Sequence, residues 1–310
     1  MAVDLTSIKL HVVSALSRMP TRTTRRALLL HTIPLVLQCR WPAAAMAMPR
    51  LIDERFGRLR NHYILLRPGE TTFEAAGLVD SNPINKGVLD RGLTDRGREQ
   101  VRQTVSELQA RGITSPIVFY DNGARATQTA EIVASLLTVP RARMEPEFRW
   151  LEARGLGVLD GTPLTQALAR MRELDAMDDV PEPNDDGTPN DSLNEVFTRL
   201  RNTILKIETC YSGEDVVLIP GDSNVLSVLA AATCGVELQQ HARFTLPPGG
   251  FYDLAELVRA TDENRFEGLV LPLPSEESIA AGRAAIREMG PRIFSDTSAG
   301  SWVLGPGVLR

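Results

Sequence analysis

The stretch HYILLRPGET, residues 62–71, joins an almost wholly apolar run to a loop that carries an arginine and an acid. Two later runs have the same character, PIVFY at 116–120 and DVVLI at 215–219. Runs this apolar are typical of parallel strands that are covered on both faces of a sheet. We therefore expect three central strands, each followed by a loop that combines glycine with charged residues.

The segments between these runs have the apolar periodicity of helices, clearest over 101–108, 126–137 and 193–207. Thr94 is placed to cap the first helix, and the sequence SLNE at 192–195 is a capping box for the third. A fourth helix is expected over 224–234, before a glycine that can end it. Strands that alternate with helices predict an α/β fold with a mostly parallel sheet, whose ligands bind at the carboxyl ends of the strands.

The composition limits the classes of partner. The 310 residues include 43% hydrophobic residues and carry a net charge of −5, as is ordinary for a globular protein. A mildly acidic chain without an overall basic surface is a poor non-specific ligand for nucleic acid or anionic lipid. We expect no nucleic-acid partner. No group of histidines, cysteines and acids has metal-ligand spacing near the predicted site, so we expect no metal and no cofactor.

The amino terminus has the composition of a targeting segment. Residues 1–26 hold five basic residues and one acid, and Arg25-Arg26 precede the apolar run 27–38, which an A-x-A-like site follows at 45–47. Twin arginines, an apolar run and such a site make the layout of a twin-arginine signal. Behind a transit-like segment, it resembles the two-part presequence of thylakoid-lumen proteins.

We therefore predict a chloroplast protein of the thylakoid lumen, with a mature chain that starts near Met48. A one-step mitochondrial or plastid presequence and a membrane anchor are the alternatives. The apolar run has 12 residues, well below the roughly 20 that span a bilayer, so the mature form is not expected to span a membrane. Cleavage would remove six basic residues and one acid and lower the net charge from −5 to −10.

The predicted organisation has four parts: a presequence over 1–47, a linker over 48–61, an α/β domain over 62–258 and a C-terminal extension over 259–310. The extension holds one amphipathic helix around 275–289 and ends in an apolar tail that packs on the domain or on a partner. Residues 175–191 form an acidic segment that we expect to be a solvated loop. Cys210 and Cys234 lie in predicted helices, and we expect two buried thiols or one disulfide.

Five sequence blocks occur in an order that resembles the histidine phosphatase (phosphoglycerate mutase-like) superfamily. They are LLRPGET at 65–71, DRGLTDRG at 90–97, ARATQTA at 124–130, Leu151-Glu152 with LDG at 159–161, and VLIPGD at 217–222. The resemblance spans residues 62–236. It implies a three-layer sandwich, with helices on both faces of the mostly parallel sheet.

The resemblance also implies phosphoryl transfer through a phosphohistidine, in which a histidine attacks phosphorus inside a clamp of arginines. The clamp arginines match Arg67 and Arg125, and the family's acid matches Glu152. Both histidine positions are proline here, Pro68 and Pro220. Proline has no side-chain lone pair and no backbone N–H, so neither residue can be phosphorylated or donate to a phosphate.

The remaining pocket residues implied by the motifs are Gly69, Glu70, Glu74, Gly221 and Asp222. Glu74 stands where many family members have an asparagine that contacts phosphate, and its carboxylate would repel that ligand.

Two other histidines remain to be considered. His62 precedes Arg67 by five residues, about 16 Å along an extended strand, and His241 follows the fourth helix. Neither is expected in the pocket.

Two interpretations of the charged residues stay open. Arg67 and Arg125 face an anionic or phosphorylated small molecule, or they pair internally with Glu70, Glu74 or Glu152. We predict a catalytically degenerate protein that acts in binding or assembly, with a small anion or a thylakoid protein complex as partner. The alternative is a phosphatase or phosphomutase that uses Glu152, Asp222 or a metal-bound water in place of histidine.

Overall fold

The chain divides into two units, Met1–Met46 and Ala47–Arg310. The computed structural model describes only residues of the second unit, namely 59–83, 85–87, 91–263, 265–266, 268, 277, 279–281 and 283–284. The predicted presequence, most of the linker and most of the C-terminal extension lie outside the described residues. Within the described ranges, no helix has the length and apolar character needed to cross a bilayer.

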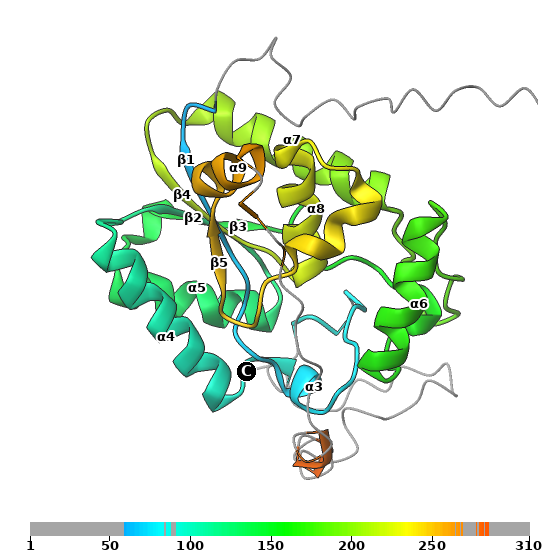
Figure 1. Ribbon diagram of the computed structural model, residues 1–310. Helices are drawn as coiled ribbons and strands as arrows, with labels where there is room; N and C mark the ends of the chain where they lie inside the picture. The colour runs from blue at the N-terminus through cyan, green and yellow to red at the C-terminus, as the bar shows by residue number, and fades with distance from the viewer. Residues whose placement is uncertain are drawn as a thin grey trace, which may run out of the picture. The chain divides into compact units, whose positions relative to one another are not determined.

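The centre of the fold is a five-stranded sheet with the order β3-β2-β4-β1-β5 (Figure 1). Its strands are β1 (His62–Leu66), β2 (Ile117–Asp121), β3 (Met144–Glu147), β4 (Asp215–Ile219) and β5 (Phe251–Asp253). Four strands are parallel, and β5 is antiparallel to β1 at one edge. The three predicted strands form its centre. The two edge strands were not predicted, because MEPE and FYD are too short and too polar for a periodic signal.

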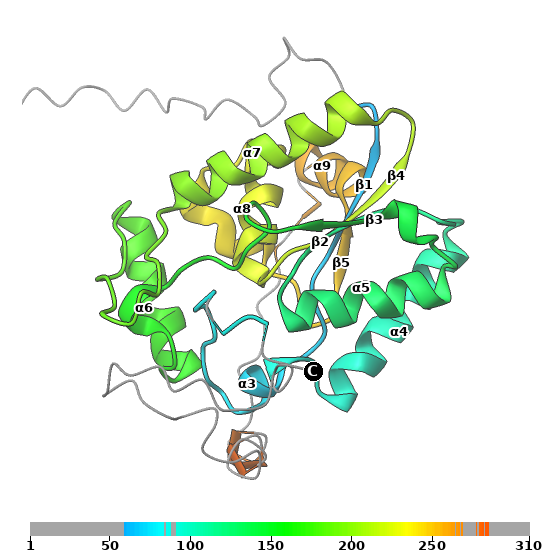
Figure 2. The ribbon, with the colours of Figure 1, turned by 180° about the vertical axis from the view of Figure 1, so that it is seen from behind.

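Helices cover both faces of the sheet, as the two opposite views show (Figures 1 and 2). One face packs on α4 (Asp95–Ala110) and α5 (Ala124–Leu136), and the other packs on α7 (Leu193–Cys210), α8 (Ser223–Cys234) and α9 (Leu254–Asp262). Side chains along β1 alternate between the two faces of the sheet. Ile64 and Leu66 pack in the core with α4 and α5, whereas Tyr63 and Leu65 pack in the core with α7, α8 and α9. The predicted three-layer α/β sandwich is therefore confirmed.

Two further helices, α3 (Thr72–Ala75) and α6 (Leu164–Ala176), lie on the side of the sheet where β1 ends (Figure 1). The 3₁₀ turns of the fold are η3 (Arg141–Arg143), η4 (Gly157–Leu159) and η5 (Leu238–Phe244). A small apolar cluster of α6, Val79 and Leu156 holds α6 next to the loop that follows α3. This arrangement places two loops and a helix around the end of β1.

The helix signals in the sequence are confirmed. The Thr94 side chain accepts a hydrogen bond from the Gly97 amide, and Ser192 and Glu195 form a reciprocal capping box. Gly235 ends α8 with φ of 69°, a left-handed conformation that favours glycine.

Two other expectations are corrected. Cys210 is exposed rather than buried, because it is the last residue of α7 and faces solvent. The acidic segment is not wholly solvated, since Asp175 is the penultimate residue of α6 and is buried in an ion pair with Arg154.

Candidate functional site

A small cavity lies at the carboxyl ends of β1 and β4. The side chains and backbone that line it come from Arg67, Pro68, Gly69, Thr71, Glu74, Arg125, Gly221 and Asp222. Seven of these residues belong to the site that the sequence indicated, and the fold brings them together. The cavity volume is about 10 Å³, which is close to the minimum that one water molecule needs. The pocket is therefore nearly full of its own side chains.

Arg67, directly after β1, is held by two acceptors within the protein. Its Nη1 donates to the carbonyl oxygen of Leu246, and its Nη2 lies 2.5 Å from Oε1 of Glu74. Glu74 is fixed in turn by the capping box of α3, where its Oε2 accepts a hydrogen bond from the Thr71 amide over 3.0 Å. The Glu74 carboxylate thus occupies the side of Arg67 that a bound anion would need.

The electrostatics agree with this pairing. Burial opposes ionisation of Glu74, but the charge of Arg67 and the Thr71 amide outweigh it and hold the pKa of Glu74 below its ordinary value. The expected repulsion between Glu74 and a phosphate is then present at neutral pH, because the carboxylate is ionised.

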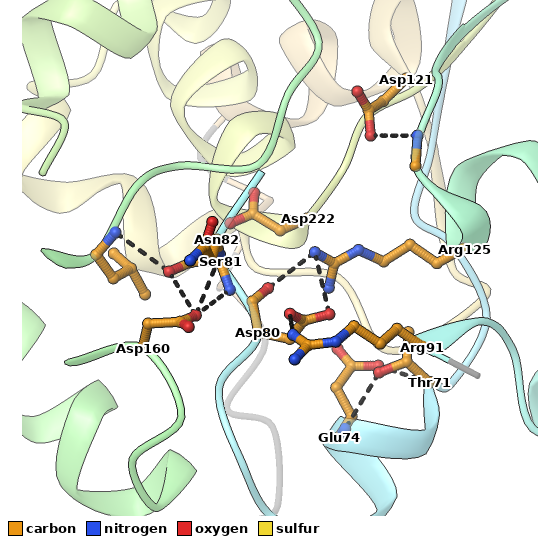
Figure 3. A network of polar contacts seen from close by, with 12 residues as sticks. Thr71, Glu74, Asp80, Ser81, Asn82, Arg91, Asp121, Arg125, Asp160 and Asp222 are labelled. Atoms are coloured by element: carbon orange, nitrogen blue, oxygen red, sulfur yellow. Dashed lines mark hydrogen bonds and ion pairs between the residues drawn. The ribbon is translucent and has the colours of Figure 1, made fainter. Parts of the chain in front are cut away.

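Arg125 is also satisfied internally, as Figure 3 shows. Its Nη2 donates to the carbonyl oxygen of Asp80 over 2.8 Å and lies 3.8 Å from Oδ2 of the same residue. The Asp80 carboxylate, 4% exposed, is shared with Arg91, whose Nη1 lies 2.5 Å from its Oδ1. Arg91 also stacks on Phe73, at 4.4 Å from the ring centroid. Burial disfavours the charge of Arg125, but Asp80 and Asp222 outweigh it and raise its pKa.

Glu152 and Glu70, which the sequence indicated for the site, do not line the cavity. The Glu152 carboxylate contacts Nζ of Lys86, which lies 3.6 Å from Oδ1 of Asp121 and 3.3 Å from the Phe148 carbonyl oxygen. Burial raises the pKa of Asp121, although Lys86 opposes the effect. Glu70 instead accepts a hydrogen bond from the Thr94 hydroxyl and lies 3.6 Å from Arg96.

The glycines of the loops allow close backbone contact. A Cβ atom on Gly69 would lie 2.1 Å from the carbonyl oxygen of Gly97, and one on Gly221 would lie 2.4 Å from the Ala153 amide. Both distances are far below van der Waals contact, so only glycine fits without a backbone shift. These contacts bring the end of β1 against α4 and the end of β4 against the 151–154 loop.

The two prolines are both buried. Pro68 lines the cavity, and its carbonyl oxygen accepts a hydrogen bond from the Gly249 amide over 3.0 Å. Pro220 does not line it, although the next two residues do. The Asp222 side chain is used structurally, because its oxygens accept hydrogen bonds from the amides of Val225, at the start of α8, and Arg154.

The described histidines lie away from the cavity, as expected. His62 opens β1 at the opposite end of the sheet and contacts two aspartates. His241 is buried in η5, with Nδ1 2.7 Å from the Ser227 hydroxyl and Nε2 3.0 Å from Asp175. Neither ring is directed at the arginines.

Three residues that pair with the predicted site residues, or with their partners, were not predicted from the sequence, namely Asp80, Lys86 and Arg91. All three belong to the segment between α3 and α4, whose sequence has no apolar period. Lys86 is one of three lysines in the chain, and that rarity was the only available signal. Asp90, in the second sequence block, lies outside the described residues. Among the residues described, no three His, Cys, Asp or Glu side chains are grouped to hold a metal ion.

The family relationship is established by the sequence. Residues 63–267 match the family model of the histidine phosphatase superfamily (branch 1), which is more than half of the chain. The chain therefore belongs to this superfamily. No curated protein matches it significantly.

Several solved structures resemble the chain. A mycobacterial glucosyl-3-phosphoglycerate phosphatase is 18% identical, with a TM-score of 0.48 over 61% of this chain and 90% of that protein. An alpha-ribazole phosphatase from Shigella flexneri is 19% identical, with a TM-score of 0.47 over 61% of this chain and 88% of that protein.

Proposed function

We propose that this protein is a catalytically degenerate member of its superfamily, which acts in binding or assembly and not in phosphohistidine chemistry. The observation that carries the proposal is the pairing inside the pocket. Pro68 stands in the cavity where the sequence motif has its nucleophile, and the guanidinium groups of Arg67 and Arg125 are taken up by Glu74 and Asp80.

The chemistry of the family reaction explains why these features matter. Phosphoryl transfer through histidine needs a nucleophilic nitrogen and positive groups that neutralise the charge of the transferred phosphoryl group. Pro68 and Pro220 supply no nitrogen lone pair. Arg67 supplies little net positive charge to a ligand, because Glu74 lies 2.5 Å from it.

The groups that could replace the histidines have other partners. Glu152 is bound to Lys86, and Asp222 accepts hydrogen bonds from two backbone amides. An alternative base needs a side chain that faces the phosphorus position and carries a free lone pair. Glu152 does not line the cavity, and Asp222, which does, is fixed by the two amides as the cap of α8, which disfavours a non-histidine phosphatase.

A closed cavity favours a protein partner over a small phosphorylated ligand, since about 10 Å³ leaves no room for a phosphate group. Our proposal includes the predicted twin-arginine signal, which would direct the protein to the thylakoid lumen of a chloroplast and so to a partner there. Cleavage near Met48 gives a markedly acidic mature chain, which suits association with a basic surface.

The activity is tested by assaying the full chain with a generic aryl phosphate and with 3-phosphoglycerate, beside Pro68→His/Pro220→His. We expect no turnover by the unmodified protein. Turnover that Arg67→Ala abolishes would overturn the proposal and establish a phosphatase with another nucleophile. The double variant shows whether the histidines alone restore the site.

The location is tested by fusing residues 1–47 to a fluorescent protein and following its import into isolated chloroplasts. We expect lumenal fluorescence, and a stromal product when Arg25-Arg26 are replaced by a lysine pair. A product that stays outside the chloroplasts, or lumenal import that does not depend on Arg25-Arg26, would contradict the two-step signal.

A further inference from the structure

At the opposite end of the sheet from the pocket, one histidine contacts two carboxylates. Nδ1 of His62 lies 2.9 Å from Oδ1 of Asp215, and its Nε2 lies 2.8 Å from Oδ2 of Asp253. The histidine side chain is 36% exposed, whereas that of Asp253 is only 12% exposed. Water therefore reaches the ring but does not replace Asp253 as its partner.

The strand pairing puts the three residues together. His62 and Asp215 are the first residues of the parallel strands β1 and β4 and are paired in register. Asp253 is the last residue of the antiparallel strand β5, which runs to the same end. Its Oδ1 accepts hydrogen bonds from the amides of Ala255 and Glu256 and so caps α9. The imidazole thus connects β4, β1 and the start of α9.

The protonation state decides whether both contacts are hydrogen bonds. A neutral imidazole has one N–H and can donate to one acceptor, whereas imidazolium has two. Ionised carboxylates only accept. Two carboxylates within 2.9 Å of the two ring nitrogens therefore require the extra proton.

The surrounding charged groups do not supply another partner. The backbone N–H of His62 donates to the carbonyl oxygen of Glu214, but the Glu214 carboxylate is 2.5 Å from Arg143. Glu208, on α7, accepts hydrogen bonds from Asn61 and Tyr63 and lies 3.6 Å from Arg60. Among the described residues, Asp215 and Asp253 are the charged groups that the ring contacts.

We propose that the protonation state of His62 controls how firmly the start of α9 and the edge strand β5 are held on the sheet. The protonated ring bonds both Asp215 and Asp253, whereas the neutral ring releases one of the two carboxylates. This role of His62 is independent of the proposed function. Protonation of His62 also affects a groove of about 450 Å³ between α4, β5 and α9, because Asp253 and Glu256 are among the residues that line it.

The titration of His62 supports this geometry. Partial burial disfavours the charged ring, but the hydrogen bonds and charges of Asp215 and Asp253 outweigh it and raise the pKa of His62 above 6.5. A histidine whose folded-state pKa is raised stabilises the fold fully at pH values below its unfolded value. That stabilisation is lost as the pH rises from 6.5 through the raised value.

Two measurements on the full chain test the proposal. The imidazole pKa of His62 is determined by NMR, with the signal assigned by its loss in His62→Gln. Amide hydrogen exchange in α9, corrected for the intrinsic pH dependence, is followed across the same pH range, with α5 as the internal reference.

We expect a pKa for His62 above 6.5 and a several-fold faster corrected exchange in α9 above it, with α5 unchanged. In His62→Gln, exchange in α9 should be fast at every pH, because glutamine carries both of its N–H groups on one nitrogen and cannot donate to carboxylates on opposite sides. A pKa at or below 6.5 would overturn the proposal. An α9 exchange rate that does not change with pH in the unmodified protein would do so too, and this test needs no variant to fold.

Discussion

Two buried arginines of this fold are neutralised in different ways. Arg154, with a side chain that is 0% exposed, donates from Nη1 and Nη2 to both oxygens of Asp175 and from Nε to the Asp191 carbonyl oxygen. Asp175 also contacts His241, which contacts Ser227, so the network joins α6, η5 and α8. Arg67 in the pocket contacts one oxygen of Glu74, whose side chain is 27% exposed.

The comparison separates an arginine that is fixed by a fully buried pair from one that is held by a single, partly exposed carboxylate. A fully buried guanidinium whose three nitrogens all donate to protein acceptors cannot change partner without local unfolding. A guanidinium with a single carboxylate contact near solvent keeps donors that another anion can use. The pocket is therefore closed by a replaceable contact, whereas the Arg154 network is permanent.

The largest expected effect is on the permanent network. Asp175→Asn removes the charge that compensates Arg154, and breaking a buried pair in this way costs about 3–5 kcal/mol. Urea denaturation measures the loss. Glu173→Gln, on the same helix, is the matched control, because its pair with Arg170 is exposed and is worth less than about 1 kcal/mol. Equal losses of unfolding free energy in the two variants would show that the buried Arg154 pair stabilises the fold no more than the exposed Arg170 pair.

The backbone of the pocket should be less tolerant than its charges. Gly69→Ala places a methyl group 2.1 Å from the Gly97 carbonyl oxygen, and relief of such a clash costs about 1–3 kcal/mol. Gly87→Ala is the control, since a Cβ there meets nothing within 4 Å. Denaturation curves should separate the variants. A Gly69→Ala protein as stable as Gly87→Ala would show that the β1 loop is not fixed against α4.

The smallest expected effect is the loss of stability on acidification that comes from the contact between Glu74 and Arg67. Because the pKa of Glu74 is lowered, its pair with Arg67 contributes stability above pH 4.5 and loses it as the pH falls through the lower folded-state value. Partial exposure limits the contribution to about 1 kcal/mol. The difference in unfolding free energy between the unmodified protein and Glu74→Gln should shrink below pH 4.5. A difference that stays constant to pH 3 would mean that the carboxylate is not paired in solution.

Much of the fold was predictable from local signals. The three apolar runs, the Thr94 cap, the 192–195 capping box and Gly235 each act within a few residues, and each is confirmed. The edge strands were not predictable, because their pairing partner lies far away in the chain and their own residues carry little apolar pattern.

The pocket was predictable in its motif residues but not in its pairing. The sequence placed Arg67, Arg125 and Glu74 in one site, yet it left internal pairing and anion binding open. The pairing of Arg125 depends on Asp80, and that of Glu152 depends on Lys86, and both partners belong to the segment between α3 and α4. Nothing in the spacing of that segment indicates which of its charged residues pairs with Arg125 or with Glu152.

The most direct test of the central claim is a calorimetric titration of the full chain with inorganic phosphate. We expect no binding by the unmodified protein and measurable binding by Glu74→Ala, since truncation removes the carboxylate from Arg67 and opens space beside it. Glu70→Ala removes an equal charge nearby without touching Arg67 and should behave like the unmodified protein. Phosphate binding by the unmodified protein that matches Glu74→Ala and disappears in Arg67→Ala would contradict the claim that the pocket is filled from within.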